Sequence, residues 1–306
     1  MKNNNIIILT GPTASGKTQY AINLAKAING HIVNFDSLQV YKHIPIISAS
    51  PSEEEKAEVP HYLYNYQDPS GHYSFQKWQQ DALVVVESII KQKKVPILVG
   101  GTPMYARKIC DGIHKTEELQ ISTMEKYKDL TNQQLQNLIC QHDDNMVNFI
   151  ATEDRKRLVK AYNHQVITGK SLKQSFSEPA TKPFAKYNIH KIMILPKKEI
   201  VLQNCETRLQ KMLDNGVVEE IKKARQIAAG NNQTFNKATG FKEISRYLDG
   251  EITIEEAFTD IAKSNKKLVK HQFTWFNNKF HDFHKHEESE ELNNTIFAIN
   301  SKGSVV

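Results

Sequence analysis

The segment LTGPTASGKTQYA, residues 9–21, constrains the fold more than any other part of this chain. It contains the full G-x-x-x-x-G-K-[ST] phosphate-binding pattern. The apolar run IIIL precedes the pattern and an amphipathic stretch follows it, so the pattern lies between a predicted buried strand and a predicted helix. In that setting backbone N–H groups can turn towards anionic oxygens at the positive end of the helix. The sequence therefore predicts a phosphate-binding loop, here called the P-loop, made of Gly11, Pro12, Thr13, Ala14, Ser15, Gly16, Lys17 and Thr18.

The segments around the P-loop predict an α/β protein with a parallel sheet. HIVNFDS (31–37) and VPILVGGT (95–102) have the composition of strands, and a helical pattern over 73–94 separates them. HKIMILP (190–196) is predicted to return to the same sheet.

A helical insertion is predicted between the third and last of these strands. Residues 113–168 contain no glycine or proline and are rich in polar, helix-forming side chains. We therefore expect a P-loop α/β core formed by residues 1–112 and 190–306, interrupted by a mainly helical insertion at 113–189.

Two longer helices are predicted after the insertion. One covers 199–214 and the other about 255–277, and the acidic segment HEESEEL (286–292) is expected to be loosely ordered. Gly216 is expected to cap the first helix. The side chains expected to face the core from that helix are Leu202, Cys205, Leu209 and Leu213.

Composition limits the class of protein. At 306 residues, with 39% hydrophobic and 24% charged residues, the chain is long enough for one large domain carrying an insertion. No apolar run reaches 18 residues, so no membrane segment is expected. The three cysteines match no metal-site spacing, which favours reduced thiols in a cytoplasmic protein. The net charge of +6 is modest, so the placement of basic residues matters more than their sum.

Three predicted strand ends should meet at one edge of the sheet, where open parallel sheets bind ligands. They carry the P-loop, Asp36 with Ser37, and Gly100 to Thr102. Asp36 is the one acid at these ends and could take a proton from a nucleophile, or it could simply cap a turn. Thr102 is equally compatible with an ordinary turn. The N-K-x-D base-reading motif of G proteins is absent from the sequence.

Seven short blocks, in order, give the chain a family resemblance. They are GPTASGKT (11–18), DSLQVYK (36–42), PHYL (60–63), DPSGHYS (68–74), LVGGT (98–102), GFKE (240–243) and QFTWF (272–276). Together they resemble the bacterial-type tRNA dimethylallyltransferases, also called tRNA isopentenyltransferases. The resemblance implies transfer of a dimethylallyl group from dimethylallyl diphosphate to the exocyclic amine of the adenine just 3′ of the tRNA anticodon.

The resemblance also implies roles for individual residues. The P-loop would hold the diphosphate, with Mg²⁺ on Thr18 and a further contact from Arg208. Asp36 would be the base or orienter for the adenine amine, and Thr102 would lie near the bridging oxygen of the donor. The residues implied to line the base pocket are Ser37, Leu38 and Gln39.

Several positions depart from the family pattern. These departures concern tRNA and phosphate contacts more than the core chemistry, and they put efficiency and tRNA choice in question. They are Ser50, Pro103, Asn163, Asn204 and Lys266.

Two basic clusters predict contact with nucleic acid. The first is a stripe on one helix face, here called the lysine stripe, and no acid follows it up to residue 280. The second lies in the insertion, which could form an opposing jaw around the tRNA anticodon stem-loop. Either cluster could instead be an ordinary solvated face. The stripe consists of Lys263, Lys266, Lys267 and Lys270, and the second cluster contains Arg155, Lys156 and Arg157.

We expect a monomer. Two alternatives remain open from the residues themselves: a P-loop small-molecule or nucleoside kinase, and a non-catalytic RNA-binding protein with a residual P-loop.

Overall fold

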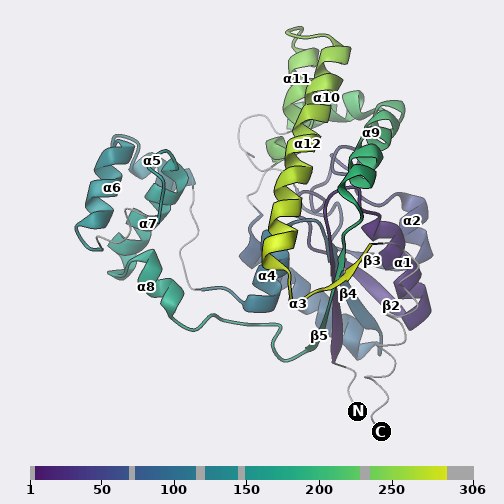
Figure 1. Ribbon diagram of the computed structural model, residues 1–306, viewed down its shortest axis with the longest axis horizontal. Coiled ribbons are helices and arrows are strands. Elements are labelled where there is room, and N and C mark those ends of the chain that lie inside the picture. The colour runs from purple at the N-terminus through teal and green to yellow at the C-terminus, as the bar shows by residue number, and fades with distance from the viewer. Residues whose placement is uncertain (1–3, 69–72, 115–120, 144–148, 228–234, 288–306) are drawn as a thin grey trace. The chain divides into compact units, whose positions relative to one another are not determined.

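The computed structural model describes residues 4–68, 73–114, 121–143, 149–227 and 235–287 (Figure 1). It divides into a core unit, formed by the chain up to Cys110 and from Phe184 onward, and an insertion unit, Asp111–Pro183. Residues 184–189, which the sequence assigned to the insertion, therefore belong to the core. Phe184 is fully buried and its ring lies 6.3 Å from that of Trp78, which explains why the core begins there.

A six-stranded parallel sheet forms the centre of the core unit, in the order β3-β2-β4-β1-β5-β6. β1 is central because its apolar run is buried on both faces, and Leu9 pairs with Val99 on one side and Ile192 on the other. The α/β fold class is confirmed. The strands are β1 (Asn5–Thr10), β2 (Gly30–Asn34), β3 (His61–Tyr62), β4 (Val95–Gly100), β5 (Asn188–Ile194) and β6 (His284–His286).

The edge strand β6 includes His286, the first residue of the acidic segment that was expected to be loosely ordered, and for this residue the expectation is wrong. His284 pairs with Ile192 of β5, and His286 with Ile194. His286 is buried, and its Nδ1 lies 3.3 Å from the hydroxyl of Tyr20. Residues 288–292 of the acidic segment lie outside the described residues.

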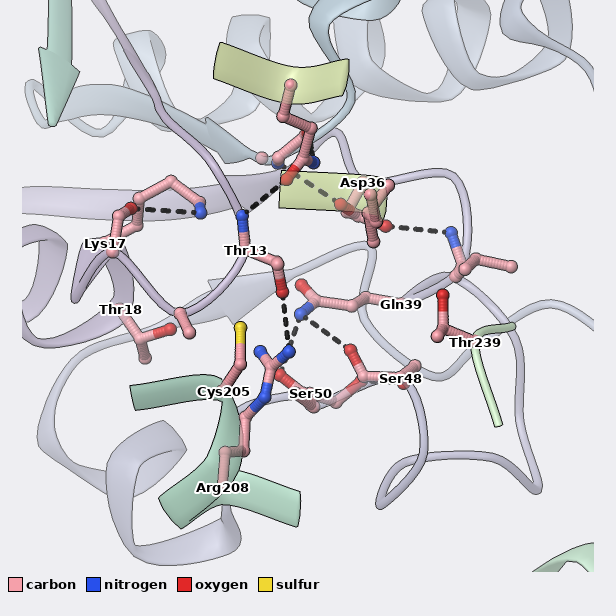
Figure 2. Close-up of a pocket in the computed structure, with 18 of the residues that line it drawn as sticks. Thr13, Lys17, Thr18, Asp36, Gln39, Ser48, Ser50, Cys205, Arg208 and Thr239 are labelled. Atoms are coloured by element: carbon pink, nitrogen blue, oxygen red, sulfur yellow. Dashed lines mark hydrogen bonds between the residues drawn. The ribbon is translucent and has the colours of Figure 1, made fainter. Parts of the chain in front are cut away.

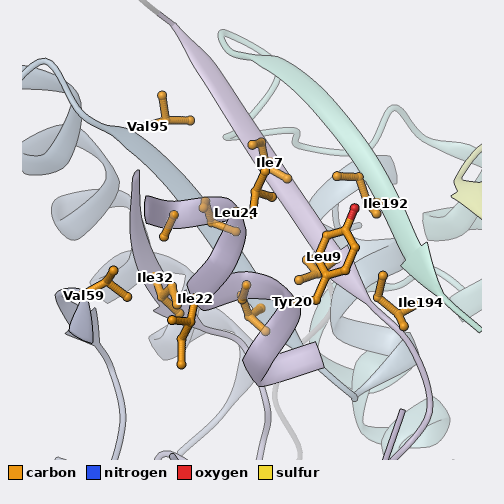
Figure 3. Packing of buried hydrophobic residues seen from close by; sticks show 14 residues of the cluster. Ile7, Leu9, Tyr20, Ile22, Leu24, Ile32, Val59, Val95, Ile192 and Ile194 are labelled. Carbon is orange, nitrogen blue, oxygen red and sulfur yellow. The ribbon is translucent and has the colours of Figure 1, made fainter. Parts of the chain in front are cut away.

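Helices cover both faces of the sheet. α1 (Lys17–Ile28) packs Tyr20 and Leu24 against Ile7 and Leu9 in the main core cluster (Figure 3). α3 (Phe75–Lys91) lies on the opposite face, against β2 and β4. There the indole N–H of Trp78 donates to the carbonyl of Asn34 at the end of β2, over 2.7 Å.

The core unit contains six further α-helices in its described residues. They are α2 (Glu53–Glu58), α4 (Pro103–Asp111), α9 (Lys198–Asp214), α10 (Val217–Ile227), α11 (Phe241–Leu248) and α12 (Ile254–Lys279). α9 and α12 pack side by side through Val201, Cys205 and Val269 (Figure 1). None of the helices in the described part of the chain is both long and apolar enough to cross a membrane.

The buried face of α9 is rotated from the expected one. Cys205 and Leu209 are buried as expected, but Leu202 and Leu213 are only half-buried. Val201 and Met212 take the buried positions instead. The C-cap is Asn215, and the expected cap, Gly216, follows it with φ of 84°.

The insertion unit has its own small core, and its regular elements in the described residues are helices, as the sequence predicts. Leu135, Ile139, Leu158 and Val159 are buried together. Its helices are α5 (Ile121–Lys126), α6 (Asn132–Cys140), α7 (Arg155–Thr168) and α8 (Leu172–Ser177).

Candidate active site

The P-loop connects β1 to α1, and its two glycines have conformations that other residues rarely adopt. Gly16 caps α1 with φ of 83°, in the left-handed region. A Cβ on Gly11 would lie 2.1 Å from the carbonyl oxygen of Ile194, so a larger residue would push the loop away from β5. The strand–loop–helix context predicted for this motif is therefore present.

Lys17 folds back over the P-loop. Its ammonium donates to the carbonyl of Pro12 over 2.5 Å and to the hydroxyl of Ser15 over 3.4 Å. Burial lowers the pKa of Lys17 to about 8; nearby Asp36 opposes this decrease, and Arg208 adds to it. An anion bound beside the ammonium would reverse the effect of burial, because an opposite charge favours the protonated form.

Asp36 and Thr102 meet where β2 and β4 end. One carboxylate oxygen of Asp36 accepts from the backbone N–H of Leu38, over 3.0 Å, as a turn-forming aspartate does. The other accepts from the N–H of Gly101 (3.2 Å) and from the hydroxyl of Thr102 (3.5 Å). The hydroxyl of Thr102 also accepts from the N–H of Ser37, over 3.2 Å. Asp36 thus forms a local turn and also presents an oxygen to the second loop.

α9 holds the tip of the P-loop through two side chains. The guanidinium of Arg208 donates to the hydroxyl of Thr13 over 2.6 Å, and the amide of Asn204 donates to the carbonyl of Ala14 over 3.0 Å. Burial lowers the pKa of Arg208. Figure 2 shows Arg208 and Cys205 directed from α9 towards the P-loop. Asn204, one of the departures from the family pattern, therefore contacts the P-loop through an uncharged side chain.

Gln272 of α12 is a further site residue, which the sequence pattern marks only as part of a longer block. Its carbonyl oxygen accepts from the N–H of Thr13 (2.9 Å), and its amide donates to the carbonyl of Gly101 (3.1 Å). One side chain thus ties the P-loop to the loop after β4. The QFTWF block was the available signal, because Gln272 is its first residue.

These groups surround one cleft of about 910 Å³ within the core unit. Gln39, predicted to line a base pocket, donates from its amide to the carbonyls of Ser48 (3.2 Å) and Ala49 (2.8 Å). Figure 2 shows the amide of Gln39 directed towards Ser48. The predicted residues that line this cleft are Thr13, Ala14, Ser15, Gly16, Lys17, Thr18, Asp36, Ser37, Leu38, Gln39, Thr102 and Arg208.

The other departures from the family pattern have plain structural roles. The hydroxyl of Ser50 lies 3.0 Å from that of Ser48 and accepts from the amide of Asn65, also over 3.0 Å. Pro103 is the first residue of α4, where its missing N–H costs no helical hydrogen bond. Asn163 is buried in the insertion and accepts from the hydroxyl of Tyr127 over 3.2 Å.

The lysine stripe is exposed on α12, but two of its four members have acidic partners. Lys263 lies 3.0 Å from Asp260, one turn earlier, and Lys266 lies 3.8 Å from Glu206 on α9. The absence of acids from 263 to 280 did not reveal these two partners, because both lie earlier in the sequence. Lys267 and Lys270 form no ion pair with any residue that the structure describes.

Arg155 has a structural role in the insertion that its sequence context did not reveal. Its guanidinium donates to the carbonyls of Tyr127 and Leu130, each over 2.8 Å, and to the side chain of Asn132 over 3.0 Å. Arg155 thus holds the segment before α6 in place, and its contact with tRNA stays a prediction. In the same cluster, Lys156 is exposed and Arg157 lies 3.3 Å from Asp154.

Comparison with known proteins identifies the family. The model of the IPP transferase family matches residues 39–279, from the loop after β2 to the end of α12. The tRNA dimethylallyltransferase of Orientia tsutsugamushi (strain Ikeda) is 36% identical over 90% of this chain and 92% of the relative. That of Rickettsia canadensis is 36% identical over 92% of this chain and 88% of the relative.

Solved structures agree with these sequence relatives. The tRNA delta(2)-isopentenylpyrophosphate transferase of Staphylococcus epidermidis matches with a TM-score of 0.67 and 27% identity, over 97% of this chain and 98% of the other. A eukaryotic dimethylallyltransferase acting on tRNA shares the fold, with a TM-score of 0.80 and 24% identity over 92% of this chain and 73% of the other. The resemblance predicted from seven short blocks is confirmed. Because the family model spans most of the sequence and relatives exceed 30% identity over nine-tenths of it, the chain belongs to the IPP transferase family.

Proposed function

We propose that this enzyme is a tRNA dimethylallyltransferase. It transfers the dimethylallyl group of dimethylallyl diphosphate to the N6 amine of the adenine 3′-adjacent to the anticodon, and it releases diphosphate. The observation that carries the proposal is the convergence of the P-loop, Asp36 and Thr102 on one cleft of about 910 Å³. A donor diphosphate and an acceptor base can share such a cleft, whereas a P-loop alone could serve a kinase equally well.

The donor side of the cleft stabilises departing diphosphate. An allylic diphosphate ionises readily, so the site must mainly neutralise the charge that develops on the leaving oxygens. The P-loop amides, Lys17 and Arg208 supply donors and positive charge for this purpose. Burial removes water from both side chains and lowers their pKa values. An anionic ligand would offset this loss of solvation, because a nearby negative charge stabilises the protonated forms.

The same residues fit a magnesium ion held jointly with the substrate. Thr18 lies in the first turn of α1 and lines the cleft, and no cluster of three His, Cys, Asp or Glu side chains among the described residues could hold a metal alone. Mg²⁺ usually takes one or two protein oxygens and completes its shell with water and phosphate. When bound, it would polarise the diphosphate oxygens as a Lewis acid.

The acceptor side positions the adenine amine and removes its proton. The C–O bond of the donor breaks, the N6–C bond forms, and the extra proton on nitrogen passes to the carboxylate of Asp36. Thr102 donates to the same carboxylate oxygen that accepts from Gly101, which holds that oxygen at the cleft. We infer that Ser37, Leu38 and Gln39 form the wall that receives the base.

Basic side chains outside the cleft would hold the RNA backbone. Lys267 and Lys270 support this role best, because they are exposed and lack ion-pair partners in the described part of the chain. Lys156 and Arg157 of the insertion are further candidates. We also propose that the protein acts as a monomer in the cytoplasm, a compartment in which its three free cysteines would stay reduced.

Ligand choice provides the direct test of the proposed function. With Mg²⁺, a non-reactive thio-analogue of dimethylallyl diphosphate at 100 times its Kd should stabilise the fold by about 2.7 kcal/mol. That gain should appear as a rise of several degrees in the unfolding temperature. ATP at the same concentration should raise the unfolding temperature much less. Stronger stabilisation by ATP, together with ATP hydrolysis, would favour the kinase alternative.

The lysine stripe gives a second test, because its members differ in their surroundings. Lys267→Ala and Lys270→Ala should each weaken tRNA binding and reduce the slope of log K against log salt by up to about one unit. Lys263→Ala serves as the matched control, since its partner Asp260 already neutralises it, and should change the slope less. Filter binding over a salt series measures these slopes. Slopes equal to that of the parent protein in all three variants would make the stripe an ordinary solvated face. Separately, tRNA binding without a gain of one dimethylallyl group in the mass of the tRNA would favour the non-catalytic alternative.

A further inference from the structure

A short turn at residues 44–50 forms one wall of the cleft. The N–H of Ser48 donates to the carbonyl of Ile44 (3.1 Å) and that of Ala49 to the carbonyl of Ile46 (3.0 Å), so the segment forms a tight hydrogen-bonded turn. The N–H groups at the start of such a turn have no partner within it. We call residues 44–50 the wall turn.

Glu220 of α10 supplies both missing partners. Its two carboxylate oxygens accept from the backbone N–H groups of Ile46 (2.7 Å) and Ile47 (2.8 Å). These residues are separated from Glu220 by more than 170 positions in the sequence, so the contact is tertiary. One half-buried side chain on α10 therefore fixes the start of the wall turn.

The other end of the wall turn faces the predicted base pocket. Ser48 and Ala49 line the cleft, and their carbonyls hold the amide of Gln39. The side chain of Ile47 packs against Gly240, the residue before α11: a Cβ on Gly240 would lie 2.9 Å from it. The start of α11 therefore supports the wall turn. A displacement of the wall turn would consequently move Gln39.

Stability alone does not account for a carboxylate at this place. Burial raises the pKa of Glu220 from 4.5 to about 7, and the two N–H groups only partly oppose the increase. The folded protein therefore binds this proton more tightly than the unfolded chain, so ionisation of Glu220 between these pH values lowers stability. No charged side chain contributes to the shift: on the same helix Lys222 lies 3.8 Å from Glu219, and Arg225 pairs with Asp249.

We propose that Glu220 is a positioning residue for prenyl transfer, which acts in its ionised form by fixing the wall turn and, through it, Gln39 and the acceptor base. This inference rests on the proposed function. It assigns Glu220 to the acceptor side of the cleft, because the wall turn contacts Gln39 and no hydrogen bond joins it to the P-loop among the described residues.

The test compares Glu220→Gln with Glu219→Gln, an exposed neighbour on the same helix. Glutamine keeps the size of the side chain but can accept only one of the two N–H groups, and its own amide opposes the other. Glu220→Gln should lower kcat/KM for an anticodon stem-loop by roughly 10- to 100-fold, the range expected for a slightly displaced substrate. Its affinity for the thio-analogue should stay within about twofold of that of the parent protein. Wild-type kcat/KM should also fall between pH 8 and 6 as Glu220 takes up a proton, and this decrease should be missing in Glu220→Gln.

A measurement without substrate separates this proposal from the proposed function. Amide hydrogen exchange of Ile46 and Ile47, compared at one pH, should be at least about tenfold faster in Glu220→Gln than in Glu219→Gln. Faster exchange in a protein that transfers no prenyl group would refute the function but keep the anchoring contact. Unchanged exchange, or an equal kcat/KM in the two variants, would overturn the role of Glu220. A parallel loss of thermal stability and analogue binding in Glu220→Gln would also overturn it, since the residue would then support the fold as a whole.

Discussion

Replacing Asp36 by asparagine should lower the rate of prenyl transfer by roughly 10² to 10⁴, the range for removing a general base. Asparagine keeps the shape of the side chain, and its carbonyl oxygen can still accept from Leu38 or Gly101. What it loses is the basicity that the amine requires as the N6–C bond forms. The loss should therefore appear in kcat more than in the KM for the donor.

Thr102→Ala is the matched comparison for this variant. It removes one hydrogen bond to the same carboxylate oxygen and should cost about 1 kcal/mol, much less than the loss of the base. Single-turnover transfer with preloaded donor and stem-loop measures both rates. A near-normal rate in Asp36→Asn would leave Asp36 as the turn-forming residue that its contact with Leu38 also describes.

Replacing Lys17 by methionine should reduce kcat/KM by roughly 10³, as expected when a main source of leaving-group stabilisation is removed. Methionine retains most of the length of the lysine side chain, so the P-loop should keep its fold. An unchanged unfolding temperature of the variant would verify this. Asn204→Ala is a suitable control because it also contacts the P-loop but carries no charge. A loss in Asn204→Ala equal to that in Lys17→Met would mean that P-loop geometry, and not the ammonium, governs the rate.

The same lysine predicts how donor affinity depends on pH. With a pKa of about 8, Lys17 of the free enzyme is charged below pH 8 and loses its proton above it. Binding of the diphosphate requires the charged form, so affinity should be level below pH 8 and fall above it, by up to about tenfold per pH unit. Titration calorimetry with the thio-analogue measures this profile. Lys17→Met should bind weakly at every pH, without the inflection.

The sequence predicts those parts of the structure that depend on residues close to one another in the sequence. The strands β1 and β4 are rich in apolar residues, β2 contains the apolar pair Ile32 and Val33, and the P-loop has fixed spacing, so the strands and the meeting of their ends at one cleft were predicted. Asp36 and Thr102 were found together for the same reason: both directly follow strands that parallel pairing brings to one edge.

Tertiary contacts set the limits of prediction. β6 is only three residues long and contains two histidines, so nothing in its composition indicates a strand; pairing with β5 creates it. Arg155 looked like a phosphate contact, and only the carbonyls of Tyr127 and Leu130 reveal its structural role. Gln272 and Glu220 were missed because each acts on backbone groups more than 170 positions away, which leaves no local pattern.

The bridge made by Gln272 has a consequence for the order in which the enzyme becomes competent during synthesis. The P-loop is synthesised well before the side chain that anchors Thr13, which belongs to α12, 259 residues later. The partner of that anchor at Gly101 is likewise 171 residues earlier than Gln272. A nascent chain therefore carries the complete phosphate-binding motif long before the motif can be held in place. Because residues of α12 line the cleft and hold the P-loop, we expect an unfinished polypeptide to bind the proposed donor weakly until this helix has been made.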